Sequence, residues 1–158
     1  MRRFHRSGGS GPRLEDWLDE HYEGVYRTAR LILLSPEAAE EAARQAFVRA
    51  WRFRAAAPAG EGTRMWLLRA VVHSCSRRLR GSVAGDGPVE DDPVLSALAA
   101  LPADERTVVV LRFWAGLSPA EAARVLGERP ERVTARLEAA LAHLAGVPLA
   151  GVAGEARR

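Results

Sequence analysis

Apolar residues recur at steps of three and four along most of this chain, and that spacing constrains the fold more than any other feature. It is the spacing of amphipathic α-helices, each of which buries one face against its neighbours. A first apolar stripe runs from Leu14 to Ile32, about five turns of helix, and Ser35-Pro36-Glu37 supplies an N-cap and a helix-starting proline for a second helix. Alanines dominate the second stripe and allow close contact between helices.

Proline and glycine interrupt the periodicity at two places in the middle of the chain. Residues 55–62 form a predicted loop, after which Thr63 caps a third helix that reaches about Arg80. Residues 81–93 combine glycines, acids and two prolines with few apolar residues, which is typical of a flexible linker. We therefore predict an all-α fold of two small helical domains, residues 13–80 and 94–145, between a disordered lead (1–12) and a disordered tail (146–158).

The second domain carries the punctuation of a helix-turn-helix. Short helices are predicted over 94–101 and about 103–114, and Ser118-Pro119-Ala120-Glu121 forms a capping box that opens the next helix. Gly127 ends that helix, and Pro130 begins a last one whose second face is polar. Two short helices around a glycine turn suit a helix-turn-helix, whose second helix enters the DNA major groove. Spacing alone leaves a second interpretation open, a helical hairpin with a solvated charged face.

Charge is distributed unevenly along the 158 residues. Residues 1–80 hold fifteen arginines against nine acids, whereas residues 81–158 hold eight arginines against eleven acids, so that the net charge of +3 conceals two opposite halves. The first half is therefore the better candidate for binding a polyanion. A single cysteine, Cys75, cannot form an internal disulfide, and no apolar run is long enough for a signal or a membrane span. We expect a cytoplasmic protein without membrane insertion.

Two long motifs resemble the extracytoplasmic-function (ECF) family of RNA polymerase sigma factors. The stretch from Leu101 to Gly127 is very similar to part of the family's carboxy-terminal domain, region 4. In the family this stretch precedes the helix of the same domain that reads the promoter's minus-thirty-five element. The first domain resembles region 2, with a helix that docks on the polymerase clamp and a helix at the minus-ten element. These similarities rest on Leu101-Pro102, Leu111-Arg112, Gly116-Leu117-Ser118 and Glu121, and on Glu40-Glu41, Ala46–Arg52, Trp66–Arg69 and Arg77–Arg80.

The resemblance implies three sets of binding residues in a sigma factor that works with core RNA polymerase and promoter DNA. For the upstream element they are Arg129, Arg132, Thr134 and Arg136. For the minus-ten region they are Arg64, Arg69, His73, Arg77, Arg78 and Arg80. For the polymerase they are Glu37, Glu40, Glu41, Gln45 and Phe47. Arginine suits the DNA surfaces because it neutralises phosphate and reads guanine edges. The family also implies an anti-sigma factor as a partner.

The chain departs from the family pattern at several of these positions. Arg44-Gln45 stands where glutamine followed by an acid is usual, and His73 and Arg77 stand where asparagine and aspartate are common. In the recognition helix the motif Gly-Ile-Ser becomes Gly127-Glu128-Arg129, and Arg136 is the one polar residue that keeps its identity. With six arginines against six acids, residues 94–145 gain little from counterion release, so we expect weak upstream binding without polymerase.

Two rival functions stay open beside the sigma factor. One is a divergent sigma-like interaction protein, which binds polymerase or a regulatory partner without initiating transcription. The other is a free-standing helix-turn-helix regulator, which the low charge beyond residue 93 disfavours. We expect no enzyme and no cofactor, since phosphate-loop glycines and a nucleophile elbow are missing from the sequence, and His73 and Cys75 lie too close along a helix to share a metal. The four tryptophans, Trp17, Trp51, Trp66 and Trp114, are predicted to lie in the core.

Overall fold

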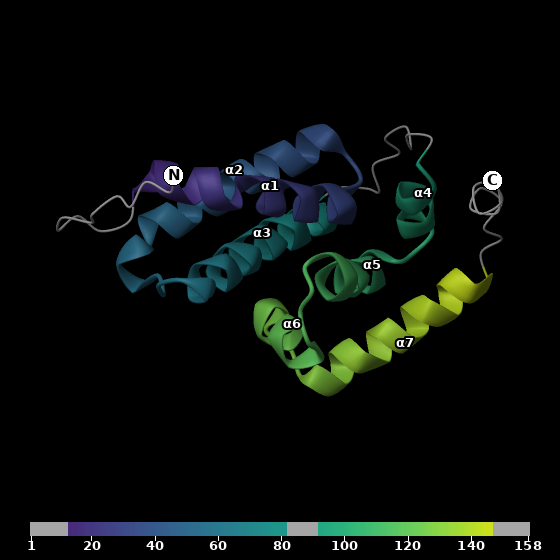
Figure 1. Cartoon of the computed structure of the whole chain (residues 1–158). Coiled ribbons are helices and arrows are strands. Elements are labelled where there is room, and N and C mark those ends of the chain that lie inside the picture. The colour runs from purple at the N-terminus through teal and green to yellow at the C-terminus, as the bar shows by residue number, and fades with distance from the viewer. Residues whose placement is uncertain (1–12, 82–91, 147–158) are drawn as a thin grey trace, which may run out of the picture.

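The computed structural model describes residues 13–81 and 92–146, and all the regular structure in these two ranges is helical (Figure 1). The predicted all-α class is therefore confirmed. α1 (Leu14–Leu33), α2 (Pro36–Arg52) and α3 (Glu61–Gly81) lie side by side as one bundle, and a short turn, η1 (Arg54–Ala56), precedes α3. The predicted lead and tail, and nearly all of the predicted linker, lie outside the described residues. No helix within the described ranges is both long and apolar enough to cross a membrane.

Local sequence signals place the boundaries of the first three helices. The Ser35 side chain accepts a hydrogen bond from the Ala38 N–H at 3.2 Å and Pro36 occupies the first turn, as predicted. α1 ends where Leu34 adopts a left-handed φ of 61°. The predicted start of α3 is wrong by two residues. The Thr63 hydroxyl does not cap that helix but donates to the Pro58 carbonyl at 2.8 Å, which ties the loop to the helix that follows.

Alanines bring the helices of this bundle close together. The buried face of α2 consists of small side chains with 0–1% of their surface exposed, together with Phe47. They pack against Val25 and Ala29 of α1 and Val71 of α3 in one hydrophobic cluster. Side chains this small leave no room for added volume, since interiors are close-packed. The buried alanines of α2 are Ala39, Ala42, Ala43, Ala46 and Ala50.

Residues 92–146, called the second half, contain four α-helices and one turn of π-helix. α4 (Pro93–Ala99) is capped by Asp92, and α5 (Ala103–Val109) runs into η2 (Val110–Trp114), a turn of π-helix. α6 (Pro119–Leu126) begins with the predicted capping box, in which Ser118 and Glu121 bond each other's backbone N–H. α6 ends at Gly127, whose φ of 69° is left-handed, and α7 (Pro130–Gly146) follows as the second helix of the helix-turn-helix.

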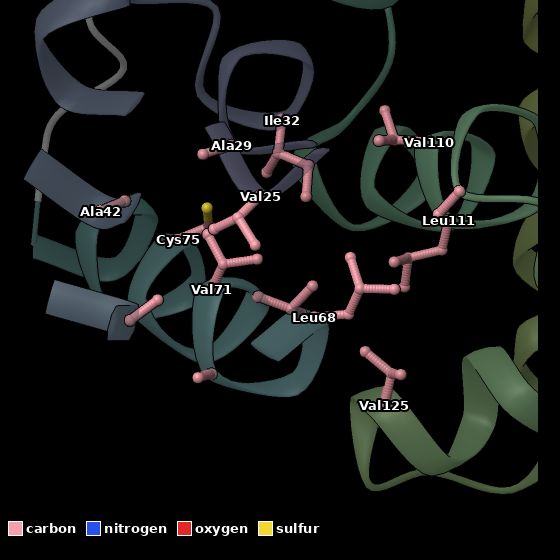
Figure 2. Close-up of a cluster of buried hydrophobic side chains, with 14 of the residues drawn as sticks. Val25, Ala29, Ile32, Ala42, Leu68, Val71, Cys75, Val110, Leu111 and Val125 are labelled. Atoms are coloured by element: carbon pink, nitrogen blue, oxygen red, sulfur yellow. The ribbon is translucent and has the colours of Figure 1, made fainter. Parts of the chain in front are cut away.

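The two halves share one continuous core, which the sequence did not predict. Leu68 of α3 faces Leu111 of η2 and Val125 of α6, and Ile32 of α1 lies toward Val110 (Figure 2). α3 packs on α6 and α1 packs on η2. The two predicted helical domains are therefore present but packed against each other, because the apolar stripes of α1 and α3 are wide enough to cover the second half as well as α2.

Two arginines add polar contacts across the junction between the halves. Arg106 of α5 is buried, and its Nε donates to the Ile32 carbonyl in the last turn of α1 at 2.8 Å. Its Nη1 donates to the carbonyls of Leu98 and Leu101 at 3.3 and 3.4 Å. Burial lowers the pKa of this guanidinium. In the opposite direction, Arg64 of α3 donates to the Ala115 carbonyl. Backbone carbonyls at the junction thus gain side-chain donors from the other half or from the following helix.

The prediction that Trp114 lies in the core is wrong. Trp114 is 47% exposed, beside the Arg27 guanidinium at 5.7 Å from the ring centroid, and Phe113 is also exposed. The reason is the π-helical turn, in which the Ala115 N–H bonds the Val110 carbonyl five residues back. The wider turn rotates the following side chains away from their α-helical directions. Trp17 is buried and makes a T-shaped contact with Trp51, with 5.7 Å between the ring centroids. Trp66 is partly buried against the core.

Candidate nucleic-acid and polymerase interfaces

One face of α3 presents a row of exposed basic side chains. Arg69, His73, Arg77 and Arg80 follow one another at steps of four and three, so they share a helix face, and all four are exposed. The pKa of His73 is lowered, first by partial burial and then by the positive charges of Arg49, Arg77, Arg80 and Arg69. These arginines therefore create a common positive field around His73, the kind of field that attracts phosphate. This group is called the α3 basic face below.

The structure divides the six residues predicted for the minus-ten region. Four of them form the α3 basic face. The other two make internal contacts, since Arg64 donates to the Ala115 carbonyl of the second half and Arg78 lies 3.8 Å from a carboxylate oxygen of Glu41. Helix periodicity accounts for this division, because positions 64 and 78 lie on sides of α3 that face α1, η2 or α2. Counting arginines along the sequence does not reveal it.

A cleft of about 820 Å³ separates the α3 basic face from the second half. Arg69, His73 and Arg80 line one wall together with Arg49 from α2. Phe53, which is 52% exposed, and Trp66 add aromatic surface. Sequence reasoning missed Arg49 and Phe53. Arg49 lies inside the motif that resembles the clamp helix, and only its position on the last turn of α2, next to α3, joins it to the other arginines.

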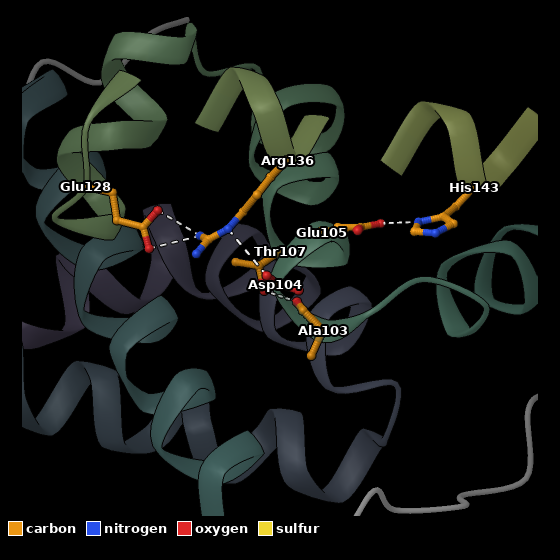
Figure 3. A network of polar contacts seen from close by, with 7 residues as sticks. All are labelled: Ala103, Asp104, Glu105, Thr107, Glu128, Arg136 and His143. Carbon is orange, nitrogen blue, oxygen red and sulfur yellow. Dashed lines mark hydrogen bonds and ion pairs between the residues drawn. The ribbon is translucent and has the colours of Figure 1, made fainter. Parts of the chain in front are cut away.

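Carboxylates line the opposite wall of this cleft. Asp104 of α5 and Glu128 of the turn between α6 and α7 lie there, and both contact Arg136 of α7. Arg136 Nη1 donates to the two carboxylate oxygens of Glu128 at 2.9 and 2.8 Å, and its Nε lies 3.4 Å from Asp104 Oδ2 (Figure 3). The cleft thus has a basic wall and a wall on which two acids hold one arginine.

The remaining residues predicted for the upstream element are exposed. Arg129 lies in the turn before α7, and Arg132 and Thr134 lie on its first two turns. The Thr134 hydroxyl donates to the Pro130 carbonyl at 3.1 Å, within its own helix. Further along α7, His143 Nδ1 lies 2.6 Å from a Glu105 carboxylate oxygen and ties the helix to α5 (Figure 3). The exposed arginines near the start of α7 are therefore separated from Arg136, whose head group is bound internally.

The residues predicted for polymerase binding lie on α2, and the structure treats them differently. Glu37, Glu40 and Gln45 are exposed. Glu41 is held by Arg44, whose Nε and Nη2 donate to its two oxygens at 2.7 and 2.5 Å, and by the Gln45 amide at 2.8 Å. These hydrogen bonds, led by that of Arg44, lower the pKa of Glu41 to about 2. The Glu41 carboxylate is therefore ionised at neutral pH, and the guanidinium of Arg44 in the same helix balances most of its charge.

Phe47 does not lie on the surface. It is 4% exposed and lies 6.0 Å, between ring centroids, from Tyr22 of α1. The apolar surface next to it comes instead from Val48, which is 60% exposed, and from the edge of Tyr22. Sequence reasoning missed Val48. Its position outside the apolar stripe of Ala39, Ala42, Ala43, Ala46, Phe47 and Ala50 was the available signal.

A family model of sigma-70 region 2 matches residues 17–83, and a family model of sigma-70 region 4 matches residues 91–144. The ECF RNA polymerase sigma factor SigM of Mycobacterium tuberculosis is 32% identical over 140 residues, covering 79% of this chain and 71% of the relative. These matches take in α1–α3 and α4–α7.

Solved structures support the same fold. The sigma factor RpoE of Bartonella quintana, solved in complex with the anti-sigma factor NepR, superposes with a TM-score of 0.71 at 18% identity, over 82% of this chain and 92% of that one. CnrH, solved in complex with the cytosolic domain of CnrY, superposes with a TM-score of 0.64 at 26% identity, over 84% of each chain. The chain belongs to the extracytoplasmic-function family of RNA polymerase sigma factors. Its function is that of a sigma factor, which directs the initiation of transcription.

Proposed function

We propose that this sigma factor divides promoter recognition between its two halves. In this proposal the domain of residues 13–80 docks on the polymerase clamp and holds the minus-ten region, and the domain of residues 94–145 binds the minus-thirty-five element. The observation that carries the proposal is the α3 basic face, with Arg49 beside it and the aromatic surface of Phe53 and Trp66 in the same cleft. Promoter opening needs cations for the backbone and aromatic surface for unstacked bases, and the cleft offers both.

The proposed polymerase contact lies on the exposed side of α2. Glu37 and Glu40 offer carboxylates to a basic surface, and Val48 offers apolar area beside them. Glu41 contributes less, because Arg44 already satisfies both of its oxygens. Phe47 supports this surface from beneath, through its contact with Tyr22.

The second half is proposed to bind duplex DNA mainly through Arg129 and Arg132, at the start of α7. Helix N-termini favour anions, since their backbone N–H groups are unpaired and the helix dipole is positive there. Equal numbers of arginines and acids over residues 94–145 make the electrostatic gain small. Attachment to polymerase through the first half then supplies the effective concentration that the second half needs.

The partners and location follow from the same proposal. The protein acts in the cytoplasm, with core RNA polymerase and promoter DNA, and without catalytic activity of its own. RpoE of Bartonella quintana was solved with an anti-sigma factor. We therefore propose that an anti-sigma factor also binds this chain, on the surfaces assigned here to DNA and polymerase.

The experiment is transcription with core RNA polymerase, purified full-length chain and a promoter library from its genome. We expect polymerase co-elution and a promoter-dependent transcript. Replacement of Arg69, Arg77 and Arg80 by glutamine should abolish the transcript and leave co-elution intact. Arg27→Gln, which removes an exposed arginine on α1, is the control and should initiate normally. Loss of co-elution in the triple variant would contradict the division of labour, and co-elution of the unaltered chain without any transcript would favour the non-initiating interaction protein.

A further inference from the structure

We infer that Glu128 limits the affinity of the second half for upstream DNA, because it competes with DNA for the guanidinium of Arg136. The inference rests on the proposed role of the second half as the module for upstream DNA. Glu128 need not touch DNA in order to act. It works as a positioning residue that decides how many arginines the recognition helix can offer.

The geometry of the ion pairs of Arg136 identifies its main partner. Two carboxylates from different elements hold one side chain, Glu128 from the turn between α6 and α7 and Asp104 from the first turn of α5. The Glu128 contact is a pair of charge-assisted hydrogen bonds at 2.9 and 2.8 Å, and the Asp104 contact is longer, at 3.4 Å (Figure 3). Charge-assisted hydrogen bonds of this length are the stronger kind. Glu128 is therefore the main partner and Asp104 the secondary one.

The side chains of the Arg136–Glu128 pair are largely shielded from water. The side chains of Arg136 and Glu128 are 22% and 21% exposed, whereas the arginine in the local pair with Glu41 is 65% exposed. Ion pairs on an open surface are worth little because water screens them, and partial burial reduces that screening. The pair also joins residues eight positions apart, across the turn of the helix-turn-helix. The pair therefore links the turn to α7 and is not a contact between neighbouring residues of one helix.

DNA and Glu128 compete for the same N–H groups of Arg136. A phosphate oxygen or a guanine edge takes the same N–H groups of arginine that a carboxylate takes. While Glu128 holds Nη1, DNA has to displace a carboxylate before it gains that donor, and the displaced carboxylate then lies near phosphate. Arg129 and Arg132 are exposed and do not face this competition. Upstream DNA is thus bound by the start of α7, with Arg136 withheld.

The test uses full-length protein and fluorescent duplex DNA, with the affinity measured over a range of salt concentrations. Glu128→Gln keeps the size of the side chain and removes its charge. Glu131→Gln is the matched control, because it removes one acid from the exposed first turn of α7 and changes the net charge equally. We expect E128Q to bind several-fold more tightly than E131Q. Its salt dependence should be steeper by about 0.9, the slope of one added phosphate contact.

Two further measurements keep the inference open to refutation. Adding Arg136→Gln to E128Q should remove the gain in affinity, since Arg136 is the side chain released. Solvent exchange of the Arg136 Nε–H, followed by NMR, should be slower than that of Arg132 in the unaltered chain and should become faster in E128Q. Equal salt slopes for E128Q and E131Q, or equal exchange at Arg136 and Arg132, would overturn the inference.

Failure of the inference is distinguishable from failure of the proposed function. If the unaltered chain binds duplex DNA and Arg132→Gln weakens that binding, the upstream role of the second half stands, whatever Glu128 does. If none of the variants binds duplex DNA at low salt, the inference fails, because the released Arg136 then gives no DNA contact, whereas the upstream role fails only if Arg132→Gln also leaves transcription with core polymerase unchanged.

Discussion

The two halves of this sigma factor treat their charges in opposite ways. In the first half arginines exceed acids, the α3 basic face stays open, and the side chain that is neutralised is an acid, Glu41, held by Arg44. In the second half arginines and acids are equal in number over residues 94–145, six of each, and one arginine, Arg136, is held by Glu128 and Asp104. Each half thus pairs one charged side chain internally, an acid in the first half and an arginine in the second, and leaves other charged side chains exposed for its partners.

The halves also differ in how they build a core. α1, α2 and α3 enclose a core of their own, in which alanines allow close packing. In the second half α4, α5 and α6 are short, with seven or eight residues each, and the apolar side chains of this half complete their burial against α1 and α3. Short helices bury little area by themselves. The second half therefore depends on the first in this closed arrangement, and the first half does not depend on the second to the same degree.

The largest expected effect comes from Leu111→Ala. Leu111 is 0% exposed at the junction of the two halves, beside Leu68 and Val125 (Figure 2). Loss of a fully buried leucine should lower the free energy of unfolding by about 2–5 kcal/mol. Urea unfolding followed by circular dichroism measures it, with Val48→Ala as the control. Val48 is 60% exposed, and its replacement should change stability by less than about 0.5 kcal/mol.

The shape of the unfolding curve tests the comparison of the two cores. One shared transition, shifted as a whole by Leu111→Ala, is expected if the junction is as continuous as the structure has it. Two transitions, of which only the second moves, would mean that the halves are stable apart, and the claim of dependence would have to be given up.

Arg106→Met should have the next largest effect. The arginine donates to the carbonyls of Ile32, Leu98 and Leu101 from a buried position, and methionine would leave those acceptors without these donors. Leaving a buried acceptor without a donor costs about 1–3 kcal/mol, and of the three acceptors the Leu98 carbonyl still keeps the Leu101 N–H. The stability loss is measured by the same urea titration. Arg124→Met, at an exposed site on α6, is the control, and a loss of equal size there would mean that charge, and not the contacts across the junction, explains the change.

Most of the fold could be predicted because its signals are local. Capping at Ser35 and Ser118, the left-handed Gly127, and the apolar stripes all act within a few residues, and each helix they predicted is present. The closed junction could not be predicted in this way. It depends on which stripe covers which, and a stripe on α1 or α3 does not say whether α2 or η2 will be its neighbour. Trp114 was misplaced for a related reason, since nothing in the sequence announced the π-helical turn.

The candidate site was predictable in part. Helix spacing placed Arg69, His73, Arg77 and Arg80 on α3, and the structure brings them to one exposed face. Arg136 and Phe47 show the limit of the method. Whether an arginine is exposed depends on acids brought near it by the fold, and Glu128 and Asp104 are eight and thirty-two positions away in the sequence. A motif that matches at one residue says nothing about that residue's partners.

Ser118→Ala tests whether the second half holds its short helices by caps as well as by the junction. The Ser118 hydroxyl accepts from the Glu121 N–H at 3.2 Å at the start of α6. Loss of an N-cap of this kind costs about 1 kcal/mol. Thermal unfolding should report a modest drop in Tm. Ser96→Ala, an exposed serine within α4, should have no such effect, and a similar drop there would remove the case for a specific cap.

The smallest expected effect, a change of pKa without a large change in stability, concerns Glu41 and Arg44. Hydrogen bonds from Arg44 and then Gln45 lower the pKa of Glu41 to about 2, below its ordinary value of 4.5. Because the folded value is the lower one, the stabilisation from this contact is fully present above about pH 4.5 and is lost as the pH falls towards about 2. Carboxyl chemical shifts followed by NMR should show that low midpoint.

Arg44→Gln decides whether the first half really neutralises an acid as the second half neutralises an arginine. It should bring the Glu41 midpoint back towards 4.5, whereas Arg77→Gln, which removes a charge from the α3 basic face, should leave it unchanged. The same variant frees Oε2 of Glu41 and leaves Oε1 with the Gln45 amide, so binding to core polymerase should become tighter if that carboxylate lies in the docking surface. A normal midpoint in the unaltered chain would mean that Arg44 does not neutralise Glu41, and the comparison with Arg136 would fail.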